Sequence, residues 1–351
     1  MKYLKSLFLV LTGLAFFTSC KKDEIIQPST PDNEGAEYVV SLNIGGEFDV
    51  EASEGPMTRL TDAALTPKNY YGVNVYCMKT DGTEYSYSHY AYGLFDNVND
   101  MKITLLEGYK YRFECTAVKE VGNFYLYADS YINQPFFVNS SSISVNSLNK
   151  FYTSSSSYFT SIKYGRTKVV SYDVEGYART YDTQYPPLDR FYGELKDFVP
   201  TDNGVATIHL KRTAFGLNLV INGVPDGSLS WRCTELECLN SSYSGTEPTE
   251  ISNIITFYSV YDCWNKADSD IYTKDFTFSF VWTRANGYQQ NFSKTFTAKR
   301  NVRTTLTVNL TGGANNITFG LQEDDSEMGS ESDSIDYNGG ALTDSEVAPT
   351  E

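Results

Sequence analysis

The chain of 351 residues has little of what most catalytic and metal sites need. It contains only two histidines, His89 and His209, and no Cys-x-x-Cys pair. A structural zinc site needs Cys or His ligands at short paired spacings, so we expect no metal and no cofactor. Hydrolysis needs paired carboxylates or a nucleophile beside a base. The acidic residues are instead spread through turns and the carboxyl-terminal tail, and we predict no catalytic residue and no enzyme activity.

Positive charge is also scarce. The sequence has 28 Lys and Arg against 44 Asp and Glu, which gives a formal net charge of −16 and argues against a nucleic-acid partner. Residues 322–351 hold ten of the acidic residues and no Lys or Arg. This Ser- and Gly-rich tail cannot bury enough apolar surface to offset the entropy of ordering it, so we predict that it is disordered.

Long apolar stretches are missing as well. The run from Leu7 to Phe17 is too short for a membrane-spanning helix, which needs roughly 20 residues. It follows Lys2 and Lys5 and ends in Phe-Thr-Ser-Cys, the pattern of a secretory signal peptide cleaved between Ser19 and Cys20. Beyond this signal, no segment shows a convincing helical period of 3.6 residues.

Aromatic residues, by contrast, are abundant: they make up 15% of the chain, with 28 Tyr and 21 Phe, and they favour strands. Alternation of apolar and polar residues predicts strands in many short segments, and Asp81-Gly82 and Asn286-Gly287 are typical hairpin turns. Segments expected to be extended are 38–50, 70–79, 84–94, 101–119, 191–199, 205–221, 229–239, 251–264, 274–284, 291–298, 301–310 and 317–321. We predict an all-β chain of two tandem Greek-key β-sandwich domains.

Turn-rich and low-complexity segments suggest the boundaries. Residues 1–19 are the signal peptide, and the polar residues 20–37 are a tether. The first sandwich is expected at 38–200, with residues 191–199 as an edge strand that closes it. The turn cluster 201–204 opens the second sandwich at 201–321, and the tail occupies 322–351.

Five cysteines remain if Cys20 is modified, an odd number that leaves at least one thiol unpaired within the chain. Burial as small apolar residues is the default reading, and their pairing stays open. The tyrosines permit two readings, since their rings either fill a core or stack on sugars, and the three tryptophans, in strands, favour the core. The five cysteines are Cys77, Cys115, Cys233, Cys238 and Cys263.

The Phe-Thr-Ser-Cys ending resembles the lipobox of bacterial lipoproteins. This resemblance implies that Cys20 is cleaved to become the first residue and carries diacylglycerol and an amide-linked acyl chain such as palmitate, enough for stable anchoring. The following Lys21-Lys22-Asp23-Glu24 resembles the signal that directs Bacteroidota lipoproteins to the outer face of the outer membrane. A solvated charged linker is the alternative. The membrane would then be a partner through the lipid anchor.

The lipobox with Lys22-Asp23-Glu24 and five further stretches together resemble the fimbrillin-like lipoproteins of Bacteroidota, and the five stretches follow in chain order. They are VVSLNIGG at 39–46, PMTR at 56–59, YYGVNVYCM at 70–78, HLKRTAFGLNLVI at 209–221 and KRNVRTTLTVNL at 299–310. The resemblance implies two sandwich domains and a lipid-anchored surface subunit that contacts other such subunits, or ligands on host or bacterial surfaces.

In that family a protease cuts after an Arg beyond the first strand, and the vacated groove accepts a strand from the next subunit. Arg59 lies at the corresponding place, although an exposed loop arginine without a role is the alternative. A donor strand at the carboxyl end should be apolar and alternating, and the acidic tail is neither. An anchor, accessory or tip role therefore fits the sequence as well as a shaft role does. Asp333-Ser334-Ile335 resembles the acceptor of Bacteroidota O-glycosylation, at Ser334. The functional rivals are a glycan-binding lipoprotein with aromatic platforms and a hydrolase.

Overall fold

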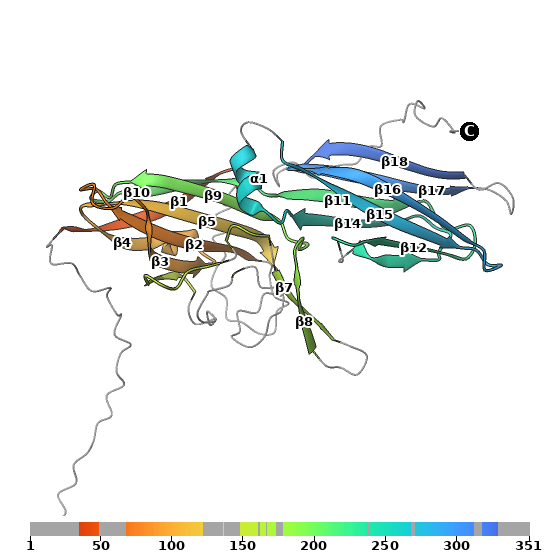
Figure 1. The fold of residues 1–351 in the computed structure, drawn as a ribbon, viewed down its shortest axis with the longest axis horizontal. Coiled ribbons are helices and arrows are strands. Elements are labelled where there is room, and N and C mark those ends of the chain that lie inside the picture. The colour runs from red at the N-terminus through yellow and green to blue at the C-terminus, as the bar shows by residue number, and fades with distance from the viewer. Residues whose placement is uncertain are drawn as a thin grey trace, which may run out of the picture.

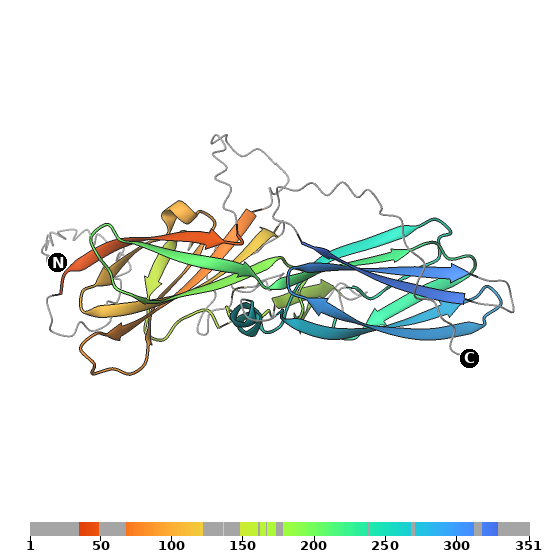
Figure 2. The same ribbon diagram turned by 90° about the horizontal axis from the view of Figure 1, so that it is seen from above.

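The structure is a computed structural model that describes residues 35–48, 68–121, 136, 148–160, 162–165, 167–172, 178–236, 239–267, 271–311 and 318–328. Strands dominate these residues, and the all-β prediction is confirmed. Figures 1 and 2 show two β-rich halves that lie end to end along the long axis. A separate two-stranded sheet pairs β7 (Thr167–Tyr172) with β8 (Ala178–Thr183).

The first half is one sheet of eight strands in the order β4-β1-β10-β9-β5-β2-β3-β6. β1 lies parallel to β10 and antiparallel to β4, and a short 3₁₀ turn, Val98–Asp100, precedes β4. The strands are β1 (Glu37–Gly46), β2 (Lys68–Lys79), β3 (Ser88–Phe95), β4 (Lys102–Leu106), β5 (Tyr109–Val121), β6 (Lys150–Thr153), β9 (Arg190–Phe198) and β10 (Val205–Arg212).

This sheet curls around its own core. Alternate residues of β1 point inward, with Val40, Leu42 and Ile44 each at most 6% exposed. They meet the inward-facing residues of the other strands in one apolar cluster that includes Phe113 of β5. Burial of such side chains is the main stabilising term of the fold.

The rolled sheet is held together across the core as well as along its strands. Tyr90 of β3 donates a hydrogen bond of 2.8 Å to the Thr104 carbonyl of β4. β3 and β4 lie near opposite ends of the strand order, so this bond joins the two margins of the sheet.

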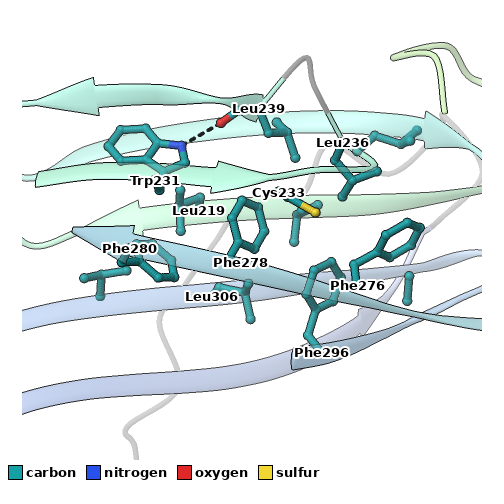
Figure 3. Close-up of a cluster of buried hydrophobic side chains, with 14 of the residues drawn as sticks. Leu219, Trp231, Cys233, Leu236, Leu239, Phe276, Phe278, Phe280, Phe296 and Leu306 are labelled. Carbon is teal, nitrogen blue, oxygen red and sulfur yellow. Dashed lines mark hydrogen bonds between the residues drawn. The ribbon is translucent and has the colours of Figure 1, made fainter. Parts of the chain in front are cut away.

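The second half is a sandwich of two four-stranded sheets, β14-β11-β17-β18 and β13-β12-β15-β16. Their inner faces contribute to one core rich in phenylalanine, part of which is shown in Figure 3. The strands are β11 (Ala214–Ile221), β12 (Ser228–Cys233), β13 (Ser241–Tyr243), β14 (Thr249–Thr256), β15 (Thr273–Thr283), β16 (Gln289–Lys299), β17 (Val302–Thr311) and β18 (Thr318–Glu327).

Four elements differ from the expectations. β10 pairs with β1 and β9 in the first sheet, although it follows the turn at 201–204 where the second domain was expected to begin. The edge-strand prediction for 191–199 is wrong, because β9 lies between β5 and β10. Residues 251–264 are not one strand: β14 ends at Thr256 and a helix, α1 (Val260–Lys266), follows. β18 continues to Glu327, inside the segment expected to be disordered.

Candidate functional site at the junction of the two halves

The residues singled out from sequence motifs lie outside the described part of the chain. This applies to Ser19 and Cys20 of the signal, Arg59 of the expected cleavage loop and Ser334 of the tail. These four assignments stay predictions. The described residues instead bring together a set of charged side chains where the two halves meet. We call this region the junction; its charged residues are Glu47, Asp189, Arg212 and Arg300.

The chain crosses the junction with almost no linker. β10 ends at Arg212 and β11 begins at Ala214, so Thr213 alone separates a strand of the first sheet from one of the second. Thr213 is fully buried. Its amide donates to the Arg190 carbonyl at 2.8 Å, and its carbonyl accepts from the amide of Phe257 at 3.0 Å. Both backbone groups are therefore satisfied within the protein, one by each half.

Arg212 is the centre of the junction. Its Nε and Nη2 donate to the two carboxylate oxygens of Asp189 at 2.9 and 3.0 Å. Its Nη1 donates to Asn301 Oδ1 at 2.9 Å and to the Met328 carbonyl at 3.3 Å. The guanidinium also lies over the Phe191 ring, 4.9 Å from its centroid. Bidentate pairing of this kind fixes orientation as well as adding energy.

Glu47 ties the end of β1 to the same place. Its amide donates to the Leu210 carbonyl at 2.8 Å, and its carboxylate accepts from the Arg212 amide at 2.8 Å. Arg300, in the turn between β16 and β17, donates to both carboxylate oxygens at 3.2 and 2.8 Å. Arg300 Nη1 also donates to the Arg212 carbonyl at 3.1 Å. One carboxylate thus joins the first strand of the chain to the second half.

Each half also inserts a residue into the other. Tyr185, which precedes β9, is 9% exposed and belongs to the core of the second half. Its ring meets Phe276 edge-on with centroids 5.0 Å apart. In the reverse direction, Val260 of α1 is buried in a cluster on the outer face of the first sheet. Reciprocal packing and the ion pairs together fix the two halves against each other.

A second charged cluster lies on the outer face of the first sheet, near α1. Glu114 of β5 and Glu194 of β9 are cross-strand partners, and each side chain is only 1% exposed. Lys163 lies between them, with Nζ 2.8 Å from Glu114 and 3.4 Å from Glu194, and over the Tyr261 ring of α1. Two buried carboxylates are tolerated because a cation lies between them.

Tyrosines complete the coordination of both carboxylates. Tyr76 donates to Glu114 at 2.7 Å, and Tyr192 donates to Glu194 at 2.6 Å. Burial alone would raise the pKa of Glu194, but the Tyr192 hydroxyl and the charges of Lys163 and Lys196 outweigh it and lower the pKa below its ordinary value of 4.5. Glu194 is thus held as a carboxylate by the Tyr192 hydroxyl and by two lysines, Lys163 and Lys196. This arrangement suits a structural ion cluster better than a general acid or base.

The two histidines lie on different strands of the first sheet. His89 of β3 is stacked on Tyr158 with centroids 3.9 Å apart, and burial lowers its pKa. His209 lies on β10, with β9, β5 and β2 between it and β3. His89 is thus a strand residue packed between aromatic rings, Tyr158 on one side and Tyr76 at 4.5 Å.

Two of the three tryptophans are core residues. Trp231 and Trp282 are 4% and 0% exposed, and their ring N–H groups donate to the carbonyls of Leu239 at 2.6 Å and Asp226 at 2.8 Å; the first of these bonds is drawn in Figure 3. Trp264 of α1 packs partly buried against Tyr192. Trp231 and Trp282 therefore cannot offer a stacking surface to a sugar.

An exposed tyrosine pair lies near the junction. Tyr164 and Tyr258 are 49% and 38% exposed, with ring centroids 5.9 Å apart and planes at 38°. Tyr164 forms an isolated β-bridge with Ser259, just before α1. The two rings thus form a shallow aromatic surface held by backbone pairing.

The described cysteines are reduced. Cys115, Cys233 and Cys263 are buried and Cys77 is half-buried, and all four are free thiols. Burial raises the pKa of Cys77 to about 11. Cys238 lies outside the described residues.

The described ranges of the chain hold neither a cluster of metal-binding side chains nor a membrane-spanning helix. These ranges hold no group of three or more His, Cys, Asp or Glu side chains placed to bind a metal ion. Their only α-helix, α1, is one of seven residues, and none of their helices is long and apolar enough to cross a membrane.

No family model and no curated protein matches the chain. Among solved structures it is similar to a candidate cell adhesion protein from Bacteroides eggerthii, with 11% identity, a TM-score of 0.35, and 84% of this chain and 97% of that chain covered. It is also similar to the fimbrial anchor protein Mfa2 from Porphyromonas gingivalis, with 12% identity, a TM-score of 0.34, and 84% and 100% covered.

A third similar structure is the tip fimbrial protein Mfa3 from P. gingivalis with a carboxyl-terminal truncation. Its identity is 9% and its TM-score 0.33, with 83% of this chain and 100% of that chain covered. The structures that the chain resembles are thus fimbrial and adhesion proteins, the class that its sequence motifs resemble. With TM-scores this low, the likeness assigns neither a function nor a site.

The sequence did not single out the junction residues. Arg212 and Arg300 lie in two of the motifs quoted above, HLKR and KRNVR, but those motifs carry no spacing rule that would pair them with Glu47 or Asp189. Only the chain path brings these four residues together.

Proposed function

We propose that the protein is a surface-exposed, lipid-anchored structural or adhesion subunit of the fimbrillin-like type, held in the outer membrane through Cys20 and without enzymatic activity. The observation that carries the proposal is the sequence LAFFTSCKKDE at 14–24, which precedes a polar tether and an all-β body. A lipid-modified cysteine followed by a flexible segment is a means of displaying a folded body at a membrane surface.

The arrangement of the halves supports this role. The carboxyl end of β1 lies at the junction through Glu47, so its first residue, Glu37, lies at the opposite end of the first half. A chain anchored ahead of Glu37 would present the second half farthest from the membrane. The turn between β15 and β16, where Tyr288 is 61% exposed, would then lie at the outer extremity (Figure 1).

The anchor is tested by Cys20→Ser in the native cells, with Cys77→Ser as the matched control. We expect Cys20→Ser to lose labelling by an alkyne analogue of palmitate and to leave the membrane fraction, and Cys77→Ser to keep both. External protease should degrade the wild-type protein on intact cells. Membrane association and labelling unchanged in Cys20→Ser would refute the anchor, and protection from external protease would refute surface exposure.

Assembly by strand exchange is the finer part of the proposal, and it concerns a form cleaved after Arg59, which would part from both Cys20 and β1. β1 is clamped between β4 and β10 and fills the core with Val40, Leu42 and Ile44, so its departure would open a groove with unpaired backbone on both sides. An Arg-specific protease should cut the wild-type protein at Arg59 and yield oligomer ladders, while Arg59→Lys stays intact and monomeric. Cleavage at Arg59 without oligomers, or no cleavage there, would remove strand exchange and leave the anchored subunit.

The exposed pair of Tyr164 and Tyr258 favours glycan binding as a second candidate function, because aromatic faces stack on sugar rings. We expect a glycan array to show binding that is lost in the double variant Tyr164→Ala, Tyr258→Ala. Tyr85→Ala, at a loop residue that is 94% exposed, is the matched control. Silence of the wild-type protein on the array would exclude this candidate.

A further inference from the structure

The first strand and the strand that leaves the first half are direct neighbours. β1 pairs in parallel with β10 from Ser41 opposite Val205 to Gly46 opposite Leu210. The Ser41 amide donates to the Gly204 carbonyl at 3.1 Å, which opens this ladder. Parallel ladders have evenly spaced bonds along both strands.

The path of the chain places this strand pair between the tether and the second half. The tether enters β1 at its amino end, and β10 leaves the first half at its carboxyl end, passing through Thr213 into β11. A pull between the tether and the second half therefore acts on the two strands in opposite directions along their axes. Load passes from β1 to the second half through the bonds between β1 and β10 and through the contact of Glu47 with Arg300, so β2, β3 and β5 to β9 lie outside the direct path.

We propose that β1 and β10 form a shear clamp that carries tension between the membrane anchor and whatever the second half holds. The source of the tension, a pull on the lipid anchor, rests on the proposed function. The clamp itself rests only on the pairing of the two strands. In shear, the bonds of the ladder resist together. When two strands are peeled from one end, their bonds break one after another.

Core packing and a second ladder reinforce the clamp. Val40, Leu42 and Ile44 are packed in the core beside Ala206, Ile208 and Leu210 of β10. The antiparallel pairing with β4, from Glu37 opposite Leu106 to Ser41 opposite Lys102, holds the amino-terminal half of β1. Sliding of β1 thus requires loss of two ladders and of the packed core face.

Glu47 locks the far end of the clamp. Its amide extends the ladder to the Leu210 carbonyl, and its carboxylate bonds the Arg212 amide and Arg300 Nη1, each at 2.8 Å. Arg300 belongs to the second half, so the end of β1 is held directly by the body that pulls on β10. Displacement of β1 along its axis must break these charge-assisted bonds, which are about twice as strong as neutral ones.

The test is single-molecule pulling of the same purified protein in two directions. In the first, handles are placed ahead of Gly35 and in the β15–β16 turn at Gly287, so that the β1–β10 ladder is loaded in shear. In the second, they are placed ahead of Gly35 and in the 201–204 turn, which loads the same ladder by peeling. Loss of the ladder frees the chain between Gly46 and Val205, which extends to roughly 550 Å at about 3.5 Å per residue and identifies the event.

We expect the event of this length to need a higher force in the first direction than in the second at equal loading rate. Equal rupture forces in the two pulling directions would overturn the clamp. It would also be overturned if, under shear loading, the second half unfolded before the β1–β10 ladder broke. Glu47→Gln should speed rupture under shear roughly tenfold through loss of charge-assisted bonds. Glu37→Gln, at the exposed start of β1, should leave it unchanged.

These outcomes are independent of the anchor. If the rupture force is the same in both pulling directions while Cys20 is labelled by the lipid analogue, the clamp is rejected and the proposed function stands. A directional clamp without labelling at Cys20 would reject the proposed source of the load and keep the clamp.

Discussion

Removal of the charge at Arg212 should uncouple the two halves. We choose Arg212→Met because methionine keeps much of the side-chain volume above the Phe191 ring while it abolishes the pairing with Asp189. The Arg212 and Asp189 side chains are 7% and 11% exposed, so Asp189 would be left as a nearly buried charge without this partner. Removing one member of such a pair costs about 3–5 kcal/mol.

The magnitude follows from the bonds that disappear. Arg212 makes two bonds to Asp189, one to Asn301 and one to the Met328 carbonyl. The last two reach the second half, so part of the loss falls on the coupling between halves and part on the first half. Arg212→Met with Asp189→Leu should recover most of the loss, because a well-packed apolar pair is often as stable as a buried ion pair.

The assay is urea unfolding followed by two signals. Trp231 and Trp282 lie in the core of the second half, whereas Trp264 packs against Tyr192 of the first half. In a Trp264→Phe background, tryptophan fluorescence therefore reports the second half, and far-UV circular dichroism reports both halves. We expect the two transitions of the wild type to coincide and those of Arg212→Met to separate. Arg232→Met, on an exposed position of β12, is the control and should stay within about 0.5 kcal/mol of wild type.

Two results would refute this reasoning. A loss below about 1 kcal/mol in Arg212→Met would show that the ion pair contributes no more than a surface bridge. Coincident transitions in that variant would show that the halves are coupled by their packing, through Tyr185 and α1, rather than by charge.

Three further predictions concern single side chains. Tyr192→Phe should lower stability by about 1.5–3 kcal/mol at pH 7; because the pKa of Glu194 is lowered, the difference should shrink as the pH falls below its ordinary value of 4.5, and a pH-independent loss in denaturant titrations would contradict it. Gly193→Ala should cost about 1–3 kcal/mol in the same titrations, since a Cβ would lie 2.2 Å from a β10 carbonyl, whereas Gly35→Ala, where a Cβ would lie 3.3 Å from the Glu107 carbonyl, should cost less. Burial raises the pKa of the Cys263 thiol, so iodoacetamide should label it only on unfolding, and rapid labelling of the native protein would refute its burial.

Much of the strand pattern could be predicted from local alternation. β1, β15 and β17 bury every second residue, and such a period is legible in the sequence. The position of β9 could not be predicted from the sequence. Its composition, with Gly193 at its middle and charged residues at its end, is typical of an edge strand. It lies in the sheet between β5 and β10, and its buried Glu194 is accommodated there by an ion pair with Lys163, a contact between distant residues that no local pattern records.

The helix and the last strand were missed for different reasons. α1 has seven residues and only two buried positions, Val260 and Cys263, too few to show a period of 3.6 residues. β18 extends past Leu321 because its acidic residues find cations: Glu323 lies 3.4 Å from Lys294, and Asp325 pairs with Lys299. An acidic composition suggests disorder only while its charges lack partners.

The parallel neighbours β1 and β10 also set the order in which the chain can fold. β1 emerges first during synthesis, yet one of its partners, β10, follows more than a hundred residues later. Closing so long a loop is slow, and topologies dominated by distant pairings fold slowly. Until residue 212 has arrived, the first half lacks a continuous sheet between β1 and β9, and its apolar strands remain open to wrong partners. For a chain exported as proposed above, we expect the nascent protein to depend on holding factors during that interval, and their removal to lower the yield of folded protein.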